Sequence, residues 1–196
     1  MASAVAFAPR ASIRAGSSLK MSAEGMVGAL PPVGFFDPLG LSNGKTDEEM
    51  KKIREAELKH GRLAMVASLG FLTGEKFNPF FDGKISGPAI YQFQQADDII
   101  PYFWVIVMFG IALVEGQTIL TAWESPDVTK ARGDTVANLK DTYVNGDLGF
   151  DPAGLKPDDP EEFDVMRTKE LQNGRLAMLG IAGMVAQELV TGQTIF

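Results

Sequence analysis

The sequence predicts an all-α membrane protein with three transmembrane helices, of which the first and third form a crossed pair related by a pseudo-two-fold axis. One observation is a duplication: Glu-Leu-Lys-His-Gly-Arg-Leu-Ala-Met at residues 57–65 returns as Glu-Leu-Gln-Asn-Gly-Arg-Leu-Ala-Met at residues 170–178. Another is that Phe-Asp-Pro precedes each copy, at residues 36–38 and 150–152. The third is the apolar block at 99–123, long enough to cross a hydrocarbon core of about 30 Å. Such duplications often give two related halves with the functional centre between them.

The N-terminal segment has the composition of a targeting peptide. Residues 1–22 contain basic residues such as Arg10 and Arg14 among serines and alanines, and the first acidic residue is Glu24. We expect a plastid or mitochondrial transit segment that is removed, which leaves residues 23–196 as one three-helix domain. The alternative is an N-terminal tail without a role.

The first helix is predicted to run from Thr46 to about Thr73. Thr46 and Glu49 have the spacing of a capping box, and acidic residues fill the first turn. Gly74 is expected to end this helix. The pairs Asn-Pro, Asp-Gly and Gly-Pro in the polar segment 74–98 predict a loop between two spans.

The three spans are expected at about residues 53–73, 100–121 and 167–189, the last within a helix that starts near residues 161–165. The middle span contains one ionisable residue, Glu115; a long buried helix of a soluble protein is its alternative. Lysine and arginine crowd the segments before the first and third spans. The positive-inside rule therefore places the N-terminus on the stromal side and the C-terminus in the lumen.

The charges of the repeat require partners if these helices enter a membrane. One unpaired charge at a span's centre costs roughly 2.5–3.5 kcal/mol. Glu57 and Arg62 lie about 140° apart on one helix and cannot pair well with each other. We therefore expect two ion pairs between the helices, Glu57 with Arg175 and Glu170 with Arg62. The alternative for either copy alone is a solvated charged turn before an ordinary core helix.

Composition excludes several functional classes. The net charge of −7 and the lack of a phosphate-binding glycine loop argue against nucleic-acid partners. The chain has no cysteine and a single histidine, which excludes thiol chemistry, a histidine dyad and a histidine-rich metal site. No nucleophile–base pair is recognisable, so we expect no enzymatic activity.

The duplicated motif, the two Phe-Asp-Pro segments and Val-Glu-Gly at residues 114–116 resemble the three-helix light-harvesting chlorophyll-binding family, most of all the fucoxanthin chlorophyll a/c proteins of diatoms and related algae. Ala-Phe-Ala-Pro at residues 6–9 resembles the cleavage motif of proteins imported into red-algal-type plastids. The likeness implies chlorophyll a, chlorophyll c and fucoxanthin or a related carotenoid as cofactors. It implies thylakoid lipids, other antenna proteins and a photosystem core as partners.

The motif also suits chlorophyll chemically. Its magnesium needs one axial ligand, and a neutral imidazole, an amide oxygen or a charge-compensated carboxylate meets that need. By resemblance the magnesium ligands are Glu57, His60, Glu115, Glu170, Asn173 and Gln187. Arg62 and Arg175 are the ion-pair partners of Glu170 and Glu57. For Glu115 the alternative is a side chain that reaches the interface, and for Gln187 a polar helix end.

The Phe-Asp-Pro segments resemble the loops that hold the end rings of two central carotenoids. The residues implied are Asp37, Pro38, Asp151 and Pro152; plain turns are the alternative. Val107 stands where chlorophyll a/b relatives have a second middle-helix ligand, and the sequence ends at Phe196, before the C-terminal amphipathic helix of those relatives. We therefore expect a different pigment set.

The leading function is a light-harvesting antenna that passes excitation energy to a photosystem. A photoprotective, energy-quenching member of the same family is the main alternative. A small membrane transporter subunit, from another class, could also retain intramembrane charges and repeats. An absorption spectrum distinguishes the classes, since a transporter would be colourless.

Overall fold

The computed structural model describes residues 27–31, 34–76, 83–134 and 136–195. The expected targeting segment and the Asn78-Pro79 breaker lie outside these ranges. The described residues are helical and turn-rich, with a single isolated bridge between Trp123 and Leu139 in place of any sheet. The helices are α1 (Asp47–Lys76), α2 (Ala89–Ile99), α3 (Phe103–Ala122), α4 (Pro126–Arg132) and α5 (Pro160–Thr191). The all-helical class predicted from the sequence is therefore confirmed for this part of the chain.

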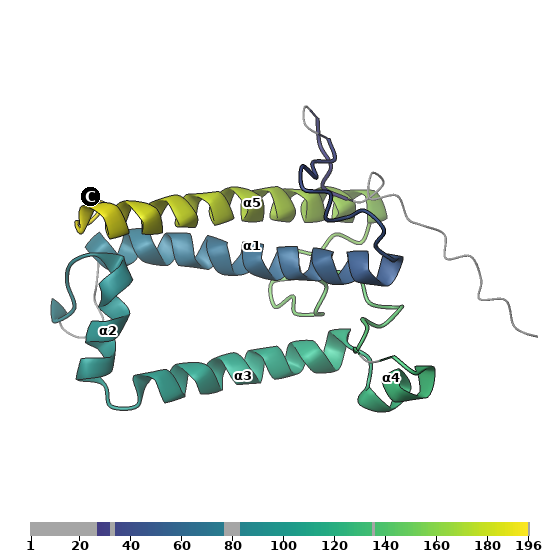
Figure 1. The fold of residues 1–196 in the computed structure, drawn as a ribbon, viewed down its shortest axis with the longest axis horizontal. Coiled ribbons are helices and arrows are strands. Elements are labelled where there is room, and N and C mark those ends of the chain that lie inside the picture. Colours follow the sequence, from purple (N-terminus) through teal and green to yellow (C-terminus); the bar gives the residue numbers. More distant parts are fainter. Residues whose placement is uncertain (1–26, 32–33, 77–82, 135, 196) are drawn as a thin grey trace, which may run out of the picture.

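Figure 1 shows α1 and α5 side by side along their length and running in the same direction, as expected for two copies of one unit. The two helices meet at equivalent glycines of the repeat, Gly61 and Gly174. The third long helix, α3, runs in the opposite direction on the other side of α1. The short helix α2 lies across the end where the α1–α5 pair finishes (Figure 1).

The start of α1 agrees with the predicted capping box, whereas its end does not agree with the predicted stop. The Glu49 carboxylate accepts the Thr46 backbone N–H at 2.9 Å, and the Thr46 hydroxyl accepts the Glu49 N–H at 3.3 Å. The helix then passes through Gly74 to Lys76. The Gln92 side chain donates to the Gly74 carbonyl at 3.1 Å, which satisfies a carbonyl in the last turn.

The segment 74–98 is not only the loop that was expected, because its second half forms α2. Pro88 is the N-cap residue of this helix, with φ of −55° and ψ of 137° and no side-chain cap hydrogen bond. The Ile90 backbone N–H donates to Glu188 on α5 at 2.8 Å. This contact between distant segments stabilises a short helix that local sequence signals alone did not indicate.

Among the described residues, α3 alone is long and apolar enough to cross a membrane by length and composition, with a mean hydropathy of 1.9. It begins at Phe103, a few residues after the predicted start of the span at about residue 100, because Pro101 interrupts the pattern and Tyr102 takes a left-handed conformation with φ of 65°. Only 6% of its apolar window is buried. The described part of the chain thus leaves most of an apolar helix exposed.

Candidate functional site

Two ion pairs join α1 and α5 on either side of the glycine contact. The Arg62 Nε atom lies 2.6 Å from Glu170 Oε1, and the Arg175 Nε atom lies 2.7 Å from Glu57 Oε1. Both cross-helix pairs predicted from the duplication are therefore present. Each carboxylate carries a compensating charge from the other helix, which lowers the cost of placing it away from water.

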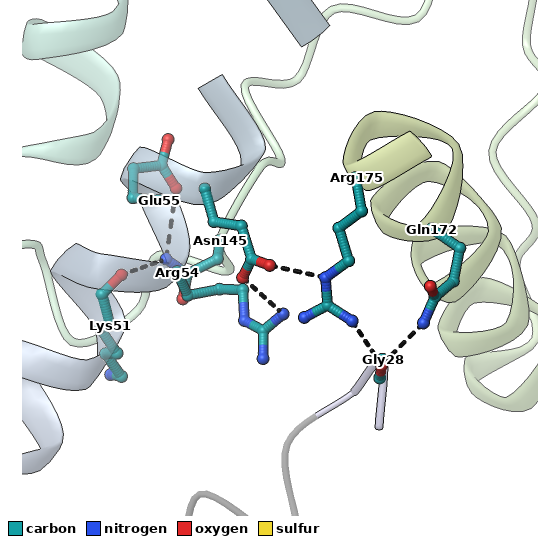
Figure 2. A network of polar contacts seen from close by, with 8 residues as sticks. Gly28, Lys51, Arg54, Glu55, Asn145, Gln172 and Arg175 are labelled. Atoms are coloured by element: carbon teal, nitrogen blue, oxygen red, sulfur yellow. Dashed lines mark hydrogen bonds and ion pairs between the residues drawn. The ribbon is translucent and has the colours of Figure 1, made fainter. Parts of the chain in front are cut away.

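Each arginine also holds a loop. The Arg62 Nη2 atom donates to the Gly146 carbonyl at 2.7 Å, and Arg175 Nη1 donates to the Gly28 carbonyl at 2.9 Å. Figure 2 shows Arg175 and Gln172 from α5 converging on Gly28. Guanidinium groups have several donors in a fixed plane, so one arginine can bind a carboxylate and a carbonyl together. The same two arginines thus bind the backbone at Gly28 and Gly146, upstream of the two Phe-Asp-Pro segments, to the helix pair.

The two halves differ in the number of cations near the glutamate. Arg54 Nη1 lies 3.0 Å from Glu57 Oε2, although it makes no hydrogen bond of regular geometry there. Its counterpart in the second copy, Arg167, instead pairs with Asp164 at 3.0 Å. Glu57 therefore has a cation beside each of its two oxygens. Glu170 has one on Oε1 alone, and its Oε2 receives no hydrogen bond from the described residues.

The two predicted neutral ligands of the repeat lie exposed on the outer sides of the helix pair. His60 is exposed, and its Nδ1 lies 2.7 Å from the Ala56 carbonyl, the preceding turn of α1. With the proton on Nδ1, which donates this hydrogen bond, Nε2 keeps a free lone pair that can bind a metal ion. Asn173 is exposed at the equivalent position of α5, and Gln187 is exposed near the end of that helix. All three side chains are accessible to a ligand outside the protein core.

Glu115 is not isolated, because Lys59 Nζ lies 2.6 Å from its Oε2. Sequence analysis did not identify Lys59, which lies on another helix and has no periodic relation to Glu115. The two side chains and His60 line a cavity of about 600 Å³ between α1 and α3. The rest of its wall is apolar or small: Leu63, Val107, Gly110, Ile111 and Val114.

A larger cavity of about 880 Å³ lies beside Glu57. It is bounded by the loop that leads into the first Phe-Asp-Pro segment and by the first turns of α1, and Arg54, Gln172 and Arg175 contribute polar groups. The remaining wall is mostly apolar, including Leu30, Phe35 and Ile53. An apolar cavity with a few polar groups at one end suits a flat, mainly hydrophobic ligand.

The aspartates of the two Phe-Asp-Pro loops bind their own backbone. Asp37 accepts N–H groups from Leu41 at 3.0 Å and Ser42 at 2.8 Å. Asp151 repeats the pattern with Leu155 at 3.0 Å and Lys156 at 2.8 Å. The Ser42 hydroxyl and N–H hold the pKa of Asp37 below its ordinary value of 3.8. These carboxylates build the turns, so any ligand contact would use other groups of the loops.

Exposed apolar side chains are what the two loops offer to a ligand. Phe36 and Leu39 are 72% and 79% exposed in the first loop. Phe150 and Leu155 are 86% and 72% exposed in the second. Pro38 and Pro152 are exposed beside them. The equivalent loops therefore present equivalent apolar surfaces.

A second group that sequence analysis missed fixes the loop before residue 150. Glu55 on α1 is 3% exposed and accepts hydrogen bonds from Tyr143 at 3.0 Å and Asn145 at 3.2 Å. Asn145 also donates to the Lys51 carbonyl, as Figure 2 shows. Burial and the neighbouring Glu55 raise the pKa of Tyr143 to about 12, so its hydroxyl stays a donor.

The opposite end of the helix pair holds two carboxyl groups that the sequence did not link. Glu188 is 0% exposed, contacts the Glu75 carboxyl group and accepts the Ile90 N–H at 2.8 Å. Glu75 accepts the Ile195 N–H at 3.0 Å. Two carboxyl groups, one from α1 and one from α5, thus come together at this end of the helix pair.

In the part of the chain that the structure describes, no three His, Cys, Asp or Glu side chains gather to hold a metal ion. The oxygen and nitrogen donors instead stand singly along the helices. Single donors suit a metal that already has four ligands from a macrocycle and needs one more.

Comparison with known proteins gives a consistent result. Residues 22–189 match the family model described as "Chlorophyll A-B binding protein". The chain is 47% identical to the chloroplastic light-harvesting complex stress-related protein 3.2 of Chlamydomonas reinhardtii, over 85% of this chain and 63% of that protein. It is 46% identical to a fucoxanthin-chlorophyll a-c binding protein of Isochrysis galbana, over 88% of this chain and 80% of that protein. The chain thus spans less than two thirds of the stress-related relatives it matches.

Proposed function

We propose that this chain, which belongs to the chlorophyll a-b binding protein family, is a light-harvesting antenna protein of the plastid thylakoid that binds chlorophylls and carotenoids and passes excitation energy to a photosystem. The observation that carries the proposal is the arrangement of single donors on a doubly ion-paired helix couple: charge-compensated Glu57 and Glu170, with exposed His60 and Asn173 one turn further on.

Chlorophyll would be held by these donors at its magnesium. Glu57, Glu170 and Glu115 offer carboxylate oxygens whose charge is compensated by arginine or lysine. His60, Asn173 and Gln187 offer neutral donors. The apolar cavities beside Glu57 and His60 fit a flat hydrophobic ring. Chlorophyll a, chlorophyll c and fucoxanthin are the pigments that the relatives' names favour.

The pigments supply light absorption and the excited state, and the chain supplies their positions. Arg62 and Arg175 hold the two helices and the two loops in fixed relation. The Phe-Asp-Pro loops offer exposed apolar side chains to carotenoid ends near Asp37, Pro38, Asp151 and Pro152. The exposed faces of the long helices would be covered by pigment and lipid.

Three spans follow from this reading, with α1 and α5 crossing the membrane beside α3. Because of their central charges, α1 and α5 do not qualify as spans by hydropathy alone. They are 30 and 32 residues long, which is about 45 Å or more and enough to cross a bilayer. With the N-terminus stromal, α2 and the Glu75–Glu188 pair would face the lumen. Other antenna proteins and a photosystem core are the proposed partners.

Refolding of the full chain with chlorophyll a, chlorophyll c and fucoxanthin in detergent tests the proposal. We expect a stable pigmented complex in which light absorbed by fucoxanthin appears as chlorophyll a emission. His60→Leu should lose one chlorophyll or a small linked group, whereas His60→Asn, the residue of the second copy, should keep it. A colourless chain, or equal pigment content in both variants, would contradict the assignment.

A photoprotective role is the second candidate. Its support is the 47% identity to relatives named stress-related, together with the buried Glu75–Glu188 contact at the proposed lumenal end. The excited-state lifetime distinguishes the two roles.

A further inference from the structure

The ion pair between Lys59 and Glu115 is the main polar link between α1 and α3. Lys59 Nζ lies 2.6 Å from Glu115 Oε2, and the two side chains are 33% and 49% exposed. Most other side chains of α3 are exposed, except at its last turns, where Thr118 and Ala122 are buried. Both side chains of this ion pair line the 600 Å³ cavity, as do His60 and Val107.

The charge of Glu115 has no partner on its own helix. Between Phe103 and Ala122 the sequence contains no lysine, arginine or histidine. Any compensation must come from another element, and among the described residues Lys59 is the cation within ion-pairing distance of Glu115. A carboxylate in an apolar, water-poor site requires such a partner.

The two oxygens of Glu115 are used differently. Lys59 binds Oε2, while Oε1 receives no hydrogen bond from the described residues. Glu170 shows the same division, with Arg62 on Oε1 alone. A carboxylate held by a cation on one oxygen keeps the other as a donor for a hard metal.

We propose that Lys59 is the positioning residue of a pigment site on α3: it neutralises Glu115 and holds Oε2, so that Oε1 serves as the axial ligand of a magnesium tetrapyrrole in the cavity between α1 and α3. This inference rests on the proposed function. It adds a third charge-compensated ligand to those of the α1–α5 pair, here formed between α1 and α3. Lys59 thereby makes pigment binding on α3 depend on the repeat motif of α1.

Lys59 could act by compensating the charge of Glu115, or the ion pair could only link α1 to α3. The two roles predict different results for one double variant. A glutamine at position 115 offers a neutral amide oxygen that needs no counterion. The double variant Lys59→Gln/Glu115→Gln has no ion pair between positions 59 and 115, so a purely structural link between α1 and α3 would be lost. It should nevertheless bind the pigment, because both the charge and the need for its compensation are removed together.

The experiment refolds the full chain and its variants with chlorophyll a, chlorophyll c and fucoxanthin, and measures pigments per polypeptide and visible circular dichroism. Lys59→Gln should lose one chlorophyll, as should Glu115→Leu, with the same missing band in the spectrum. Lys59→Arg and the double glutamine variant should keep the wild-type content. Lys52→Gln removes a charge elsewhere on α1, at a side chain that forms no ion pair with the residues the structure describes. It is the matched control and should change nothing.

Full pigment content in Lys59→Gln would overturn the inference, as would loss of the pigment in the double glutamine variant while Lys52→Gln refolds normally. If Lys59→Gln fails to refold, the double variant and Lys59→Arg still decide, since both retain charge balance. A wild-type chain that takes up no chlorophyll would refute the proposed function itself. A pigmented wild type with an unaffected Lys59→Gln would refute only the role of Lys59.

Discussion

Gly61 and Gly174 bring the backbones of α1 and α5 into direct contact. A Cβ atom added to Gly61 would lie 3.0 Å from the Gly174 Cα, and one added to Gly174 would lie 2.9 Å from the Gly61 Cα. The contact is reciprocal, as a pseudo-two-fold axis through the crossing point requires. The ion pairs on either side obey the same relation.

Gly61→Ala should therefore destabilise the helix pair despite alanine's higher helix propensity. The added methyl group meets backbone atoms, which cannot move aside as a side chain can, and overpacking of this kind costs about 1–3 kcal/mol. Thermal loss of pigment circular dichroism measures the effect. Gly180→Ala on α5 is the control, because its Cβ would meet nothing within 4 Å. Equal melting temperatures for the two variants would argue against a backbone contact at Gly61.

Replacing Arg175 by Gln should prevent stable pigmented refolding. Glu57 would lose its closest cation and keep only Arg54, which lies 3.0 Å away without a regular hydrogen bond. Part of the cost of about 2.5–3.5 kcal/mol for a charge at the centre of a span would therefore return. The loop bond from Arg175 to the Gly28 carbonyl would also be weakened. Arg175→Lys should rescue in part, because lysine keeps the charge but not the planar geometry. The yield of pigmented monomer is the measurement.

The position of Arg54 changes what a charge exchange should do. Glu57→Arg with Arg175→Glu would place the new arginine beside Arg54, which lies 3.0 Å from the present Glu57 carboxylate. We expect only partial recovery from this exchange, and better recovery when Arg54→Gln is added. A double exchange no better than the single changes, at equal expression, would show that the pairing does not hold the helices.

The turns of the Phe-Asp-Pro loops should resist mild acid. Hydrogen bonds from the Ser42 hydroxyl and N–H lower the pKa of Asp37, and the Lys156 N–H does the same for Asp151, from 3.8. A lowered folded-state pKa stabilises the loop above the unfolded value, and this stabilisation is lost as the pH falls through the folded value. Pigment content should stay constant from pH 7 to about pH 5 and fall only below about pH 4.

Asp37→Ala should remove this stabilisation at every pH, because the N–H groups of Leu41 and Ser42 lose their acceptor. Asp37→Asn should retain part of it, since the amide oxygen still accepts. Asp141→Asn, an exposed aspartate outside the loops, is the control. Carotenoid loss on gel filtration reports the outcome, and an unaffected Asp37→Ala variant would assign the loop's stability elsewhere.

The two ion pairs between α1 and α5 were predictable because the motif that forms them occurs twice. Once Glu57 and Arg62 could not pair on one helix, the second copy supplied the only symmetric solution. Arg54 could have been found by the same logic, since it lies one turn before Glu57 and Arg167 holds the equivalent place. That Arg167 turns to Asp164 instead depends on side-chain positions that no repeat determines.

Contacts between unrelated segments were not predictable in this way. Lys59 meets Glu115 because α3 happens to pass that face of α1, and no periodicity links the two residues. The helix α2 forms where turn-rich sequence predicted a loop, since Gln92 and Glu188 bond it to the ends of α1 and α5. Tertiary contacts of this kind override weak local preferences.

Harvesting and quenching are distinguished by the excited-state lifetime of the isolated monomer. A harvester must hold its pigments without strong quenching contacts, so that energy outlives transfer to a photosystem. We expect a long chlorophyll fluorescence lifetime that changes little when dilute monomers are acidified from neutral pH to about pH 5. The reason is that Glu188 and Glu75 already accept backbone N–H groups of Ile90 and Ile195, which hold this end of the helix pair together.

Acid-induced quenching, the opposite outcome, can be tested by replacing Glu75 and Glu188. A switch needs protonation that biases a second conformation, and the buried Glu75–Glu188 contact is where the described chain brings two such groups together. If acid shortens the lifetime in wild type but not in Glu75→Gln/Glu188→Gln, the protein is an acid-switched quencher. Asp97→Asn/Asp98→Asn on α2, exposed acids of the same end, is the control. A lifetime that is short at every pH would instead indicate a constitutive quencher, and an unchanged long lifetime in all three proteins supports the antenna role.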